Sequence, residues 1–429
     1  SEAKSGYGIT SKATIFPGHC RFRPPQPLIL SAVRFGWEQV YIWLETWDLC
    51  PACSGPFSPG AKPRKQLSKI SDSLPKALIS PKVYWIPGKD FELHVVKQIR
   101  EECMSEKARL FLTRRLPQTV MDFLDHHFQL TFNDENRVLN KAEIIAGASD
   151  CQALLCLLTD RIDAEVIESL PELKVISNYA VGFDNVDVEA ATRKGIPVCN
   201  TPGVLTSATA DLTWTLILAV NRRIAEADRF VRAGGFQGWD PLLFLGREVS
   251  GLTLGIVGMG RIGQAVARRG LGFDMRILYT KRRPLAPEEA ISRAEHVDLD
   301  VLLRKADIVS LHLPYSTQVH HLIDDRALSV MKPQAVLINT ARGALVDETA
   351  LVSALKSDQL AGAGLDVYEH EPAVHPGLLE LDRVVLAPHI GSATERARVR
   401  MGRMAAENAL AVLQNGQVHS LANPQVFVR

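Results

Sequence analysis

Apolar residues recur in short, regularly spaced runs along the chain from about residue 107 onward. Brief runs rich in Leu, Ile and Val alternate with longer stretches in which apolar positions lie three or four residues apart. The first pattern is typical of buried strands and the second of amphipathic helices. Strands that alternate with helices form a parallel sheet covered on both faces, so the pattern predicts an α/β fold.

The first series of these elements ends near residue 199, and Thr201-Pro-Gly203 follows it as a predicted hinge. The predicted strands span residues 108–113, 129–132, 153–158, 173–178 and 196–199. The predicted helices span residues 119–128, 142–148, 163–170 and 186–194.

A long helix is predicted over residues 208–231, because apolar residues crowd its middle. A helix that is apolar over much of its circumference is buried, either within one chain or between two. We interpret this helix as an interface and predict a homodimer formed through residues 208–245. The apolar residues in question are Trp214, Leu216, Ile217, Leu218 and Val220.

The second series begins at Leu252, and its six predicted strands fit a dinucleotide-binding fold. One of its helices is predicted over residues 349–356, and the last helix, over residues 394–413, is expected to return to the first series. The strands span residues 252–257, 275–279, 308–313, 335–339, 363–367 and 384–386.

Two α/β domains follow from these patterns. Residues 204–390 are predicted to form a Rossmann dinucleotide-binding domain. Residues 104–203 and 391–429 are predicted to form a discontinuous, flavodoxin-like substrate-binding domain. Because ligands of open α/β sheets bind beyond the carboxyl ends of the strands, we expect the site in a cleft between the two sheets.

Residues 1–103 differ from the rest of the chain, since they hold four of the six tryptophans and are rich in proline. We expect them to be largely disordered, with residues 29–47 as the one plausible helix. Cys50-Pro-Ala-Cys53 is half of a zinc-site pattern, but no second pair of ligands follows at a usable spacing. Met104 directly precedes the regular series. The sequence leaves open whether residues 1–103 are an extension or translated upstream sequence without function.

Composition excludes several classes of protein. Hydrophobic residues make up 46% and charged residues 23%, with a formal net charge of +1. This balance gives no reason to expect a nucleic acid or a membrane as partner. The seven cysteines are irregularly spaced, and no apolar run approaches the roughly 18 to 20 residues that a membrane helix needs. We therefore expect a cytoplasmic protein.

A glycine-rich turn joins the first strand of the second series to the next helix. Gly258, Gly260 and Gly263 match the pattern G-x-G-x-x-G after the apolar run Leu252–Val257. The first glycine permits a tight turn, the second admits a pyrophosphate and the third allows close helix–strand packing. The helix N-terminus offers N–H groups to the phosphates. This context predicts dinucleotide binding.

The residues after the next strand indicate which dinucleotide is bound. An NAD site usually places an acid about 20 residues beyond the glycines, where it binds the ribose 2′-hydroxyl. Here that position is Thr280, and Lys281, Arg282 and Arg283 follow it. Three cations attract a 2′-phosphate, so we predict NADP(H) in preference to NAD(H).

Arg342, Glu371 and His389 follow three successive predicted strands of the second series. Arginine can bind a substrate carboxylate in a bidentate manner, histidine exchanges protons near neutral pH, and a neighbouring carboxylate stabilises the imidazolium. Taken singly, each residue could equally be a surface ion pair or a packed side chain. The acidic run from Asp366 to Glu371 shows no metal-ligand spacing, so we expect no metal.

Several motifs together closely resemble the D-isomer-specific 2-hydroxyacid dehydrogenases, and within them the glyoxylate/hydroxypyruvate reductases. The resemblance covers about residues 107–429 and leaves residues 1–103 without a counterpart. Beside the glycine-rich turn, it is carried by Asn178–Asp187, Asn200–Asp211, Thr340–Gly343, Gly364–Val367 and Pro388–Thr394.

The resemblance implies a role for each residue at the strand ends. Arg342 is expected to bind the carboxylate of a 2-oxo acid and to polarise its keto oxygen. His389, kept protonated by Glu371, is expected to donate a proton while hydride passes from nicotinamide C4 to the substrate's C2. Asp366 is expected to orient the nicotinamide carboxamide.

It also implies substrate contacts from the other domain. The backbone amides of Val181 and Gly182 are expected to bind the carboxylate, and Leu158 is expected to line the pocket. Trp239 either reaches the pocket of a partner subunit or packs locally. Together with Arg342, Asp366, His389 and the basic residues 281–283, the predicted cofactor contacts are Thr209, Gly258, Met259, Gly260, Arg261, Ile262, Gly263, Leu313, Pro314, Thr340, Ala341 and Gly391.

The leading hypothesis is an NADPH-linked reductase of glyoxylate or hydroxypyruvate. A first alternative is a D-2-hydroxyacid dehydrogenase with another 2-oxo acid as substrate, since no pocket residue fixes the preference. A second alternative is a non-catalytic, dinucleotide-sensing binding protein on the same fold, because such proteins can keep the Arg-Glu-His set.

Overall fold

The computed structural model describes residues 34–35, 38–39 and 107–427 of the chain. The chain divides into two units, Ser1–Lys89 and Asp90–Arg429. In the first unit, β1 (Arg34–Phe35) pairs antiparallel with β2 (Glu38–Gln39). The helix predicted over residues 29–47 is therefore wrong at these four residues, where Gly36 between the strands disfavours a helix. The other predictions for residues 1–103, including the Cys50–Cys53 pair, lie outside the described residues.

The first sheet of the second unit has five parallel strands in the order β4-β3-β5-β6-β7. This is the flavodoxin-like order, as predicted. The strands are β3 (Arg109–Leu112), β4 (Gln129–Phe132), β5 (Ala153–Cys156), β6 (Val175–Asn178) and β7 (Val198–Cys199). The helices between them are α3 (Gln118–His127), α4 (Lys141–Ala148), α5 (Ala164–Glu168) and α6 (Val188–Arg193).

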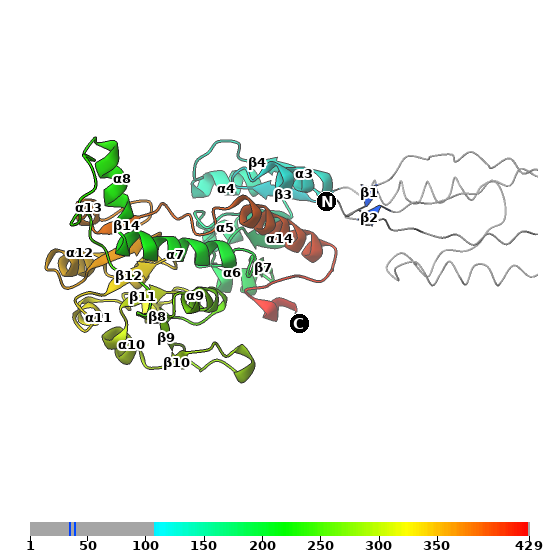
Figure 1. Ribbon diagram of the computed structural model, residues 1–429. Helices are drawn as coiled ribbons and strands as arrows, with labels where there is room; N and C mark the ends of the chain where they lie inside the picture. The colour runs from blue at the N-terminus through cyan, green and yellow to red at the C-terminus, as the bar shows by residue number, and fades with distance from the viewer. Residues whose placement is uncertain (1–33, 36–37, 40–106, 428–429) are drawn as a thin grey trace, which may run out of the picture. The chain divides into compact units, whose positions relative to one another are not determined.

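The C-terminal helix α14 (Glu395–Leu413) packs against this first sheet and lies beside α3 (Figure 1). Its main chain accepts two hydrogen bonds from residues at the end of β6. Ser177 Oγ donates to the carbonyl oxygen of Ala405, and the Tyr179 hydroxyl donates to that of Arg398, both at 2.8 Å. The short helix η6 (Pro424–Phe427) ends the described chain.

The second sheet has seven parallel strands in the order β10-β9-β8-β11-β12-β13-β14. Its first six strands have the Rossmann order, with the direction of winding reversing between β8 and β11. The strands are β8 (Thr253–Val257), β9 (Arg276–Thr280), β10 (Ala294–His296), β11 (Ile308–Leu311), β12 (Val336–Asn339), β13 (Gly362–Leu365) and β14 (Val384–Leu386). The helices are α9 (Arg261–Leu271), α10 (Leu299–Lys305), α11 (Asp325–Ser329), α12 (Glu348–Lys356) and α13 (Pro376–Leu379), with the short turns η3 (Pro287–Glu289), η4 (Thr317–Val319) and η5 (Gly343–Leu345).

The prediction of six strands was one too few, because it missed β10. This strand lies at the edge of the sheet, and its sequence Ala-Glu-His is short and mostly exposed. An edge strand of this kind has no apolar run, so the hydrophobic pattern carries no signal for it.

The helix predicted over residues 208–231 is two helices, α7 (Thr206–Asn221) and α8 (Ile224–Arg232). Arg223 between them has a left-handed φ of 55°, which ends the first helix. The carbonyl oxygen of Asn221 accepts a hydrogen bond from the amide of Arg247 at 2.8 Å. A tertiary hydrogen bond thus occupies a carbonyl group at the end of α7. The local sequence pattern does not reveal this contact.

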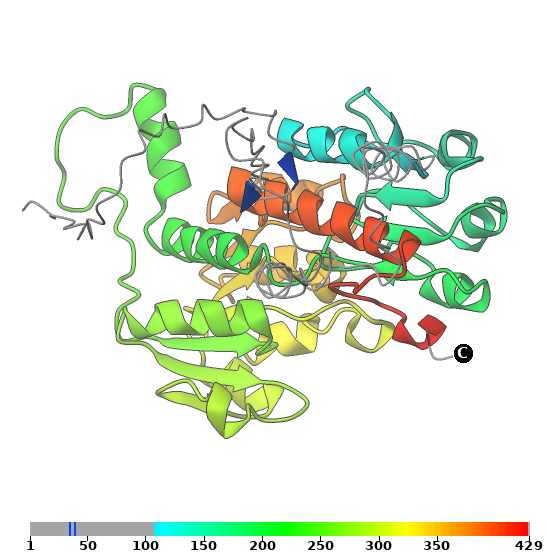
Figure 2. The same ribbon diagram turned by 90° about the vertical axis from the view of Figure 1, so that its right-hand side faces the viewer.

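The apolar middle of α7 is buried within one chain. Trp214, Leu216 and Ile217 are at most 5% exposed, and the Trp214 ring stacks on Phe273 with centroids 4.7 Å apart. These residues therefore give no support to a dimer. In Figures 1 and 2, α8 and the loop after it project away from the second sheet. None of the helices in residues 107–427 combines the length and the apolar character needed to span a membrane.

Candidate active site

The carboxyl ends of the central strands of the second sheet lie in register. Val257 pairs with Leu311, Leu311 with Asn339, Asn339 with Leu365, and Leu365 with Leu386. Parallel strands that end in one row place the loops that follow them at one edge of the sheet. Those loops bring together most of the predicted cofactor contacts, among them Met259, Ile262, Leu313, Pro314, Thr340 and Ala341.

The glycine-rich turn has the geometry that its pattern predicts. Gly258 has a φ of 98°, and a Cβ there would lie 2.6 Å from the carbonyl oxygen of His312. A Cβ on Gly263 would lie 2.3 Å from the carbonyl oxygen of Gly258, so α9 packs closely on the turn. Around Gly260, by contrast, no described atom would come within 4 Å of a Cβ. Because no side chain caps the N-terminus of α9, its first N–H groups are available to an anion.

The basic turn follows β9, the strand next to β8. Lys281 is partly exposed, and Arg282 and Arg283 are exposed. Within residues 107–427, these three side chains form no salt bridge. The main chain of the turn is held instead by His296, whose Nε2 lies 2.9 Å from the carbonyl oxygen of Lys281. The turn therefore presents three unneutralised cations.

Glu371 and His389 form a hydrogen-bonded pair between two loops of the edge. His389 Nδ1 lies 2.8 Å from Glu371 Oε2, and the other carboxylate oxygen accepts from the Tyr368 amide at 3.1 Å. Burial favours the neutral acid, but the hydrogen bond and charge of His389 outweigh it, so the pKa of Glu371 lies below its usual value. An ionised carboxylate thus orients the imidazole.

Asp366 fixes the backbone that carries His389. Its two carboxylate oxygens accept hydrogen bonds from the amides of Ile390 and Gly391 at 2.7 and 2.8 Å. Burial raises the pKa of Asp366 despite these bonds. Thr209, on α7, donates to the carbonyl oxygen of Gly391 at 3.1 Å. His389 itself has a φ of 52°, and this network holds its loop in that conformation. The sequence had not predicted this bracing role.

Arg342 reaches from the second sheet to the first. Asn339, the last residue of β12, shapes its turn by accepting from the Ala341 amide and donating to the Arg342 carbonyl oxygen. The Arg342 side chain forms a salt bridge of 3.0 Å with Asp184, in the loop after β6. Sequence reasoning missed Asp184, although it lies inside the motif Asn178–Asp187.

The loop after β6 brings Gly182 to Arg342. A Cβ on Gly182 would lie 1.6 Å from Arg342 Nη2, so only a glycine leaves room for the guanidinium there. Asn178 donates to the Gly182 carbonyl oxygen at 2.8 Å, and Asn200 donates to that of Val181 at 2.7 Å. Within residues 107–427, the amides of Val181 and Gly182 donate to no acceptor.

Two further residues, Leu158 and Trp239, were predicted to contact the substrate. Leu158 follows β5, at the same edge of the first sheet as the Val181 loop, and is partly exposed. Trp239 lies in the projecting segment after α8, and its side chain is 86% exposed. Within the described residues of one chain, Trp239 is not brought to Arg342 or His389.

Known proteins are similar to this chain over about 75% of its length. Residues 214–391 match the model of the D-isomer specific 2-hydroxyacid dehydrogenase NAD binding domain. The glyoxylate reductase of Thermococcus litoralis is 47% identical over 327 residues, which cover 75% of this chain and 98% of that protein. The chain belongs to the D-isomer-specific 2-hydroxyacid dehydrogenase family. It is an NAD(P)-dependent dehydrogenase, and the predicted pair of α/β domains is confirmed.

Solved structures share the fold of this dehydrogenase. A glyoxylate reductase from Paecilomyes thermophila aligns with a TM-score of 0.68 at 35% identity, covering 75% of this chain and 100% of that one. An NADPH-dependent glyoxylate/hydroxypyruvate reductase from Sinorhizobium meliloti, in complex with NADP and malonate, aligns with a TM-score of 0.66 at 31% identity. That alignment covers 74% of this chain and 97% of the other.

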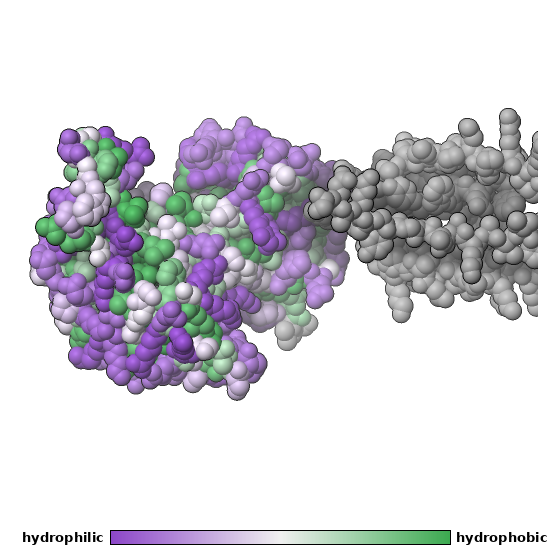
Figure 3. All heavy atoms as spheres, in the orientation of Figure 1, coloured by the Kyte–Doolittle hydropathy of each residue, from purple (hydrophilic) through white to green (hydrophobic). Residues whose placement is uncertain are grey.

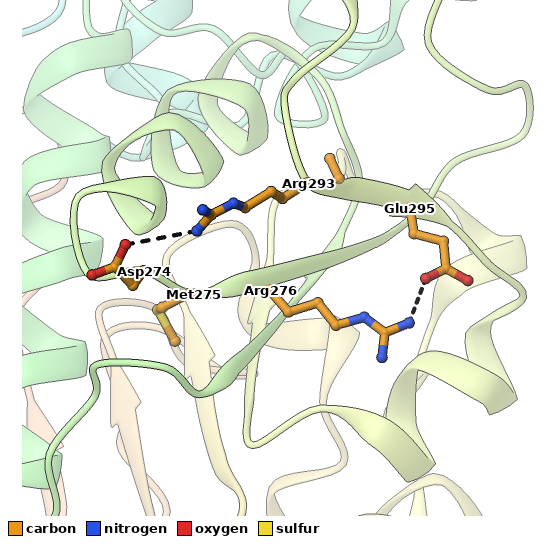
Figure 4. Close-up of a pocket in the computed structure, with 6 residues that line it drawn as sticks. Asp274, Met275, Arg276, Arg293 and Glu295 are labelled. Atoms are coloured by element: carbon orange, nitrogen blue, oxygen red, sulfur yellow. Dashed lines mark hydrogen bonds and ion pairs between the residues drawn. The ribbon is translucent and has the colours of Figure 1, made fainter.

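One hollow of this dehydrogenase lies at the other end of the strands of the second sheet, and it does not belong to this site. It lies at the amino ends of β9 and β10 (Figure 4). Its charged side chains pair with one another, Arg293 with Asp274 at 3.6 Å and Arg276 with Glu295 at 2.5 Å. The hollow therefore offers no unpaired charge to a dinucleotide.

Among the described residues, one group of side chains of this dehydrogenase could hold a metal ion, namely His320, His321 and Glu369. It shares only Glu369 with the acidic run considered from the sequence. His321 Nε2 lies 2.6 Å from Glu369 Oε1, so a hydrogen bond is sufficient to explain the cluster.

Proposed function

We propose that this dehydrogenase reduces glyoxylate to glycolate and hydroxypyruvate to D-glycerate, using NADPH. The observation that carries the proposal is the His389–Glu371 pair at 2.8 Å, on the same sheet edge as Arg342 and the glycine-rich turn. A proton donor, a carboxylate ligand and a dinucleotide site in one place fit the reduction of a 2-oxo acid. The names of the relatives from Thermococcus and Paecilomyes support glyoxylate as the substrate.

In this proposal, the substrate's carboxylate binds between the two domains. Arg342 donates to the carboxylate from one side, and the free amides of Val181 and Gly182 donate from the other. The positive charge of Arg342 also polarises the nearby keto oxygen, which gains negative charge as the reaction proceeds. Leu158 contributes an apolar wall. The bound dinucleotide supplies the hydride that is added to the substrate's C2.

His389 supplies the proton in the proposed reaction. Because its Nδ1 faces Glu371, its Nε2 is the nitrogen that can reach the substrate oxygen. The ionised Glu371 stabilises the imidazolium and fixes the orientation of the ring. Asp366, already bonded to two backbone amides, retains lone pairs for the carboxamide of a bound nicotinamide.

The preference for NADPH is supported by the basic turn. In a Rossmann fold, the ribose of the adenosine binds just after the strand that is β9 here. This position holds Thr280 rather than an acid, and it is followed by Lys281, Arg282 and Arg283. Cations without an acidic partner attract a 2′-phosphate, whereas an acid at Thr280 would repel it. The relative from Sinorhizobium meliloti, described as NADPH-dependent, agrees with this preference.

The test is a parallel assay of dinucleotide oxidation with glyoxylate, hydroxypyruvate, pyruvate and 3-phosphohydroxypyruvate. We expect the highest kcat/KM for the first two substrates, and at least a tenfold higher kcat/KM with NADPH than with NADH. His389→Ala serves as the control, since it should lower kcat by a factor of about 100 or more while dinucleotide still binds. A preference for NADH would contradict the cofactor assignment, and no turnover in the panel would contradict the activity.

We also propose that the chain forms a homodimer through residues 208–245. The support now comes from α8 and the following loop rather than from α7. On this projecting segment, apolar side chains are visible among polar ones (Figure 3). The exposed ones are Ile224, Val231, Phe236, Trp239, Leu242, Leu243 and Leu245. Exposed apolar groups of this number on one segment are typical of a protein–protein interface. In such a dimer, Trp239 would reach the partner subunit.

A further inference from the structure

The hydrogen bonds of the Arg342 guanidinium leave one of its edges open. A guanidinium carries five N–H groups in a rigid plane. Nε donates to both carboxylate oxygens of Asp184 at 3.1 and 3.2 Å, and Nη2 donates to its Oδ1 at 3.0 Å. Nη1 donates to the carbonyl oxygen of Ala341 at 2.8 Å. Two of the five N–H groups, one on each terminal nitrogen, therefore have no acceptor among residues 107–427.

These two N–H groups are the pair that a carboxylate can bind side by side. Nε and Nη2 together form the side edge of the guanidinium, and Asp184 occupies that edge. Because Ala341 is the preceding residue, Nη1 uses the N–H that points back toward the main chain. The remaining two N–H groups lie parallel at the end of the plane, which is the geometry of bidentate carboxylate binding.

Asp184 is itself held in place by the loop that carries it. Asn178 donates to the Gly182 carbonyl oxygen at 2.8 Å and to Asn185 Oδ1 at 3.0 Å. Asn185 in turn donates to the carbonyl oxygen of Leu157 at 3.0 Å. The residues on both sides of Asp184 are thus anchored to the ends of β6 and β5. A carboxylate on an anchored loop can impose one orientation on a long, flexible side chain.

We propose that Asp184 is the positioning residue for Arg342: it binds the side edge of the guanidinium, so that the end edge faces the substrate's carboxylate. The ion pair also links the dinucleotide-binding domain to the substrate-binding domain at the site. This inference rests on the proposed function, in which Arg342 binds the 2-oxo acid.

The charge state of Asp184 is compatible with this role. Burial favours its neutral form, but the charge and hydrogen bonds of Arg342 outweigh burial, so the pKa of Asp184 lies below its usual value. The side chains of Arg342 and Asp184 are 28% and 44% exposed. Water therefore screens their attraction, and the pair contributes more to orientation than to stability.

A different role for Asp184 would change KM in the opposite direction. If Asp184 only occupied the place of the substrate's carboxylate, the substrate would have to displace it, and removing it would lower KM. If Asp184 positions Arg342, removing it leaves the guanidinium with many orientations, so KM rises and kcat falls. A displaced catalytic group can lower the rate by about 100-fold.

The experiment compares Asp184→Asn and Asp184→Ala in the full chain, with kcat and KM for the oxo acid and the Kd of the dinucleotide. We expect kcat/KM to fall by roughly 10- to 100-fold in Asp184→Ala. The fall should be smaller in Asp184→Asn, whose amide oxygen can still accept from Nη2, and the Kd should not change. Asp300→Asn is the control, since it removes an exposed partner of Arg326 at 2.9 Å on the outer helices. A lower KM in Asp184→Ala would overturn the inference.

A double-mutant cycle separates positioning from a general effect on the fold. Lysine lacks the planar pair of N–H groups that a carboxylate can hold in one orientation. Asp184→Ala should therefore lower kcat/KM by less than about threefold in an Arg342→Lys background. If Asp184→Ala lowers kcat/KM in that background as much as it does in the wild type, Asp184 acts through other contacts and the inference is wrong. Equal thermal unfolding midpoints confirm that each variant is folded.

A readout without turnover distinguishes this inference from the proposed function. The ¹⁵Nε–H resonance of Arg342, assigned by its absence in Arg342→Lys, should be protected from solvent exchange in the wild type. The protection should be lost in Asp184→Ala and retained in Asp300→Asn. Protection without any oxo-acid turnover would leave the positioning of Arg342 intact and refute the proposed activity. A resonance that exchanges equally fast in the wild type and Asp184→Ala would refute the positioning.

Discussion

Three carboxylates in this protein have a pKa below the usual value despite burial, and each has a specific basic partner. Glu371 is held by His389, Asp184 by Arg342, and Asp307 by two cations at once. Burial without such a partner raises the pKa of a carboxyl group. Asp366 follows this rule, since burial raises its pKa although two backbone amides donate to it.

These partnerships also decide which site residues the sequence could reveal. Arg342, Glu371 and His389 could be predicted because each lies in a loop after a recognisable strand and the resemblance to the family gives each a role. Asp184 was missed because its partner lies 158 residues away, and no local spacing connects the two. The bracing of the His389 loop by Asp366 was missed for the same reason, since it depends on hydrogen bonds to amides 24 and 25 residues further on.

Asp307 gives a prediction about stability and pH. It binds Arg247 at 2.9 Å, Lys332 at 3.0 Å and the amide of Thr253 at 2.9 Å. Burial opposes its ionisation, but these partners outweigh burial and lower the pKa of Asp307. A lowered carboxyl pKa contributes stability above the unfolded value of about 3.9, and this stability is lost as the pH falls through the folded value.

We therefore expect Asp307→Asn to lower the free energy of unfolding at pH 7 by about 1 to 3 kcal/mol. The difference from the wild type should shrink as the pH falls below about 4, where the carboxylate becomes protonated in the unfolded chain, and continue to shrink toward the lower folded pKa. Thermal or urea unfolding between pH 7 and pH 3.5 measures this. Asp134→Asn, which removes the exposed pair with Arg115, should change stability by less than about 0.5 kcal/mol at any pH. A difference that does not depend on pH would contradict the linkage.

Strands and helices were predicted well where one short pattern determines them. The buried strands of both sheets consist of apolar runs, and their predicted ranges overlap the observed ones. The pattern failed where a tertiary contact or an edge position decides the structure. Arg247 takes over a carbonyl at the end of α7, and β10 pairs with a neighbour on only one side. Neither effect is encoded in the local alternation of polar and apolar residues.

The turn between β8 and α9 separates two roles of glycine. In Gly263→Ala the new Cβ would meet the carbonyl oxygen of Gly258, so we expect a loss of about 1 to 3 kcal/mol of stability. In Gly260→Ala the space is open and φ is −83°, so stability should change little. The same Cβ would occupy the space that a pyrophosphate approaches, so the Kd of the dinucleotide should rise by at least tenfold.

Calorimetric unfolding and dinucleotide titration of the two variants test this separation. If Gly260→Ala binds the dinucleotide as tightly as the wild type does, the pyrophosphate does not lie against Gly260. If Gly263→Ala is as stable as the wild type, the helix can shift away from the turn.

At the scale of the whole molecule, most of the exposed large apolar side chains within residues 107–427 lie on one segment, from α8 to residue 245. Within residues 107–427, the cores of both sheets are closed by their own helices, including the apolar middle of α7. The segment from α8 to residue 245 is different, because α8 has no buried residue and the loop after it exposes large apolar side chains. A soluble monomer rarely exposes so many together, which favours a second copy as the cover.

We expect the wild-type chain to sediment at about twice its mass of 47.3 kDa. Leu242 and Leu245 are 75% and 64% exposed, so charging both should cost the single chain little while disrupting an interface. The double variant Leu242→Glu/Leu245→Glu should therefore sediment as a monomer with unchanged secondary structure. Leu379→Glu, at a 65% exposed position on α13, should remain dimeric. A wild type that sediments as a monomer would contradict the proposed dimer.

The substitution Trp239→Ala distinguishes a site shared between two subunits from an interface that only holds the dimer together. If its side chain enters the partner's pocket, Trp239→Ala should raise KM for the oxo acid in a protein that still sediments as a dimer. If it only packs at the interface, the same substitution should weaken the dimer and leave KM unchanged at concentrations where the dimer persists. Because Trp239 is 86% exposed in one chain, neither outcome can arise from damage to that chain's own core.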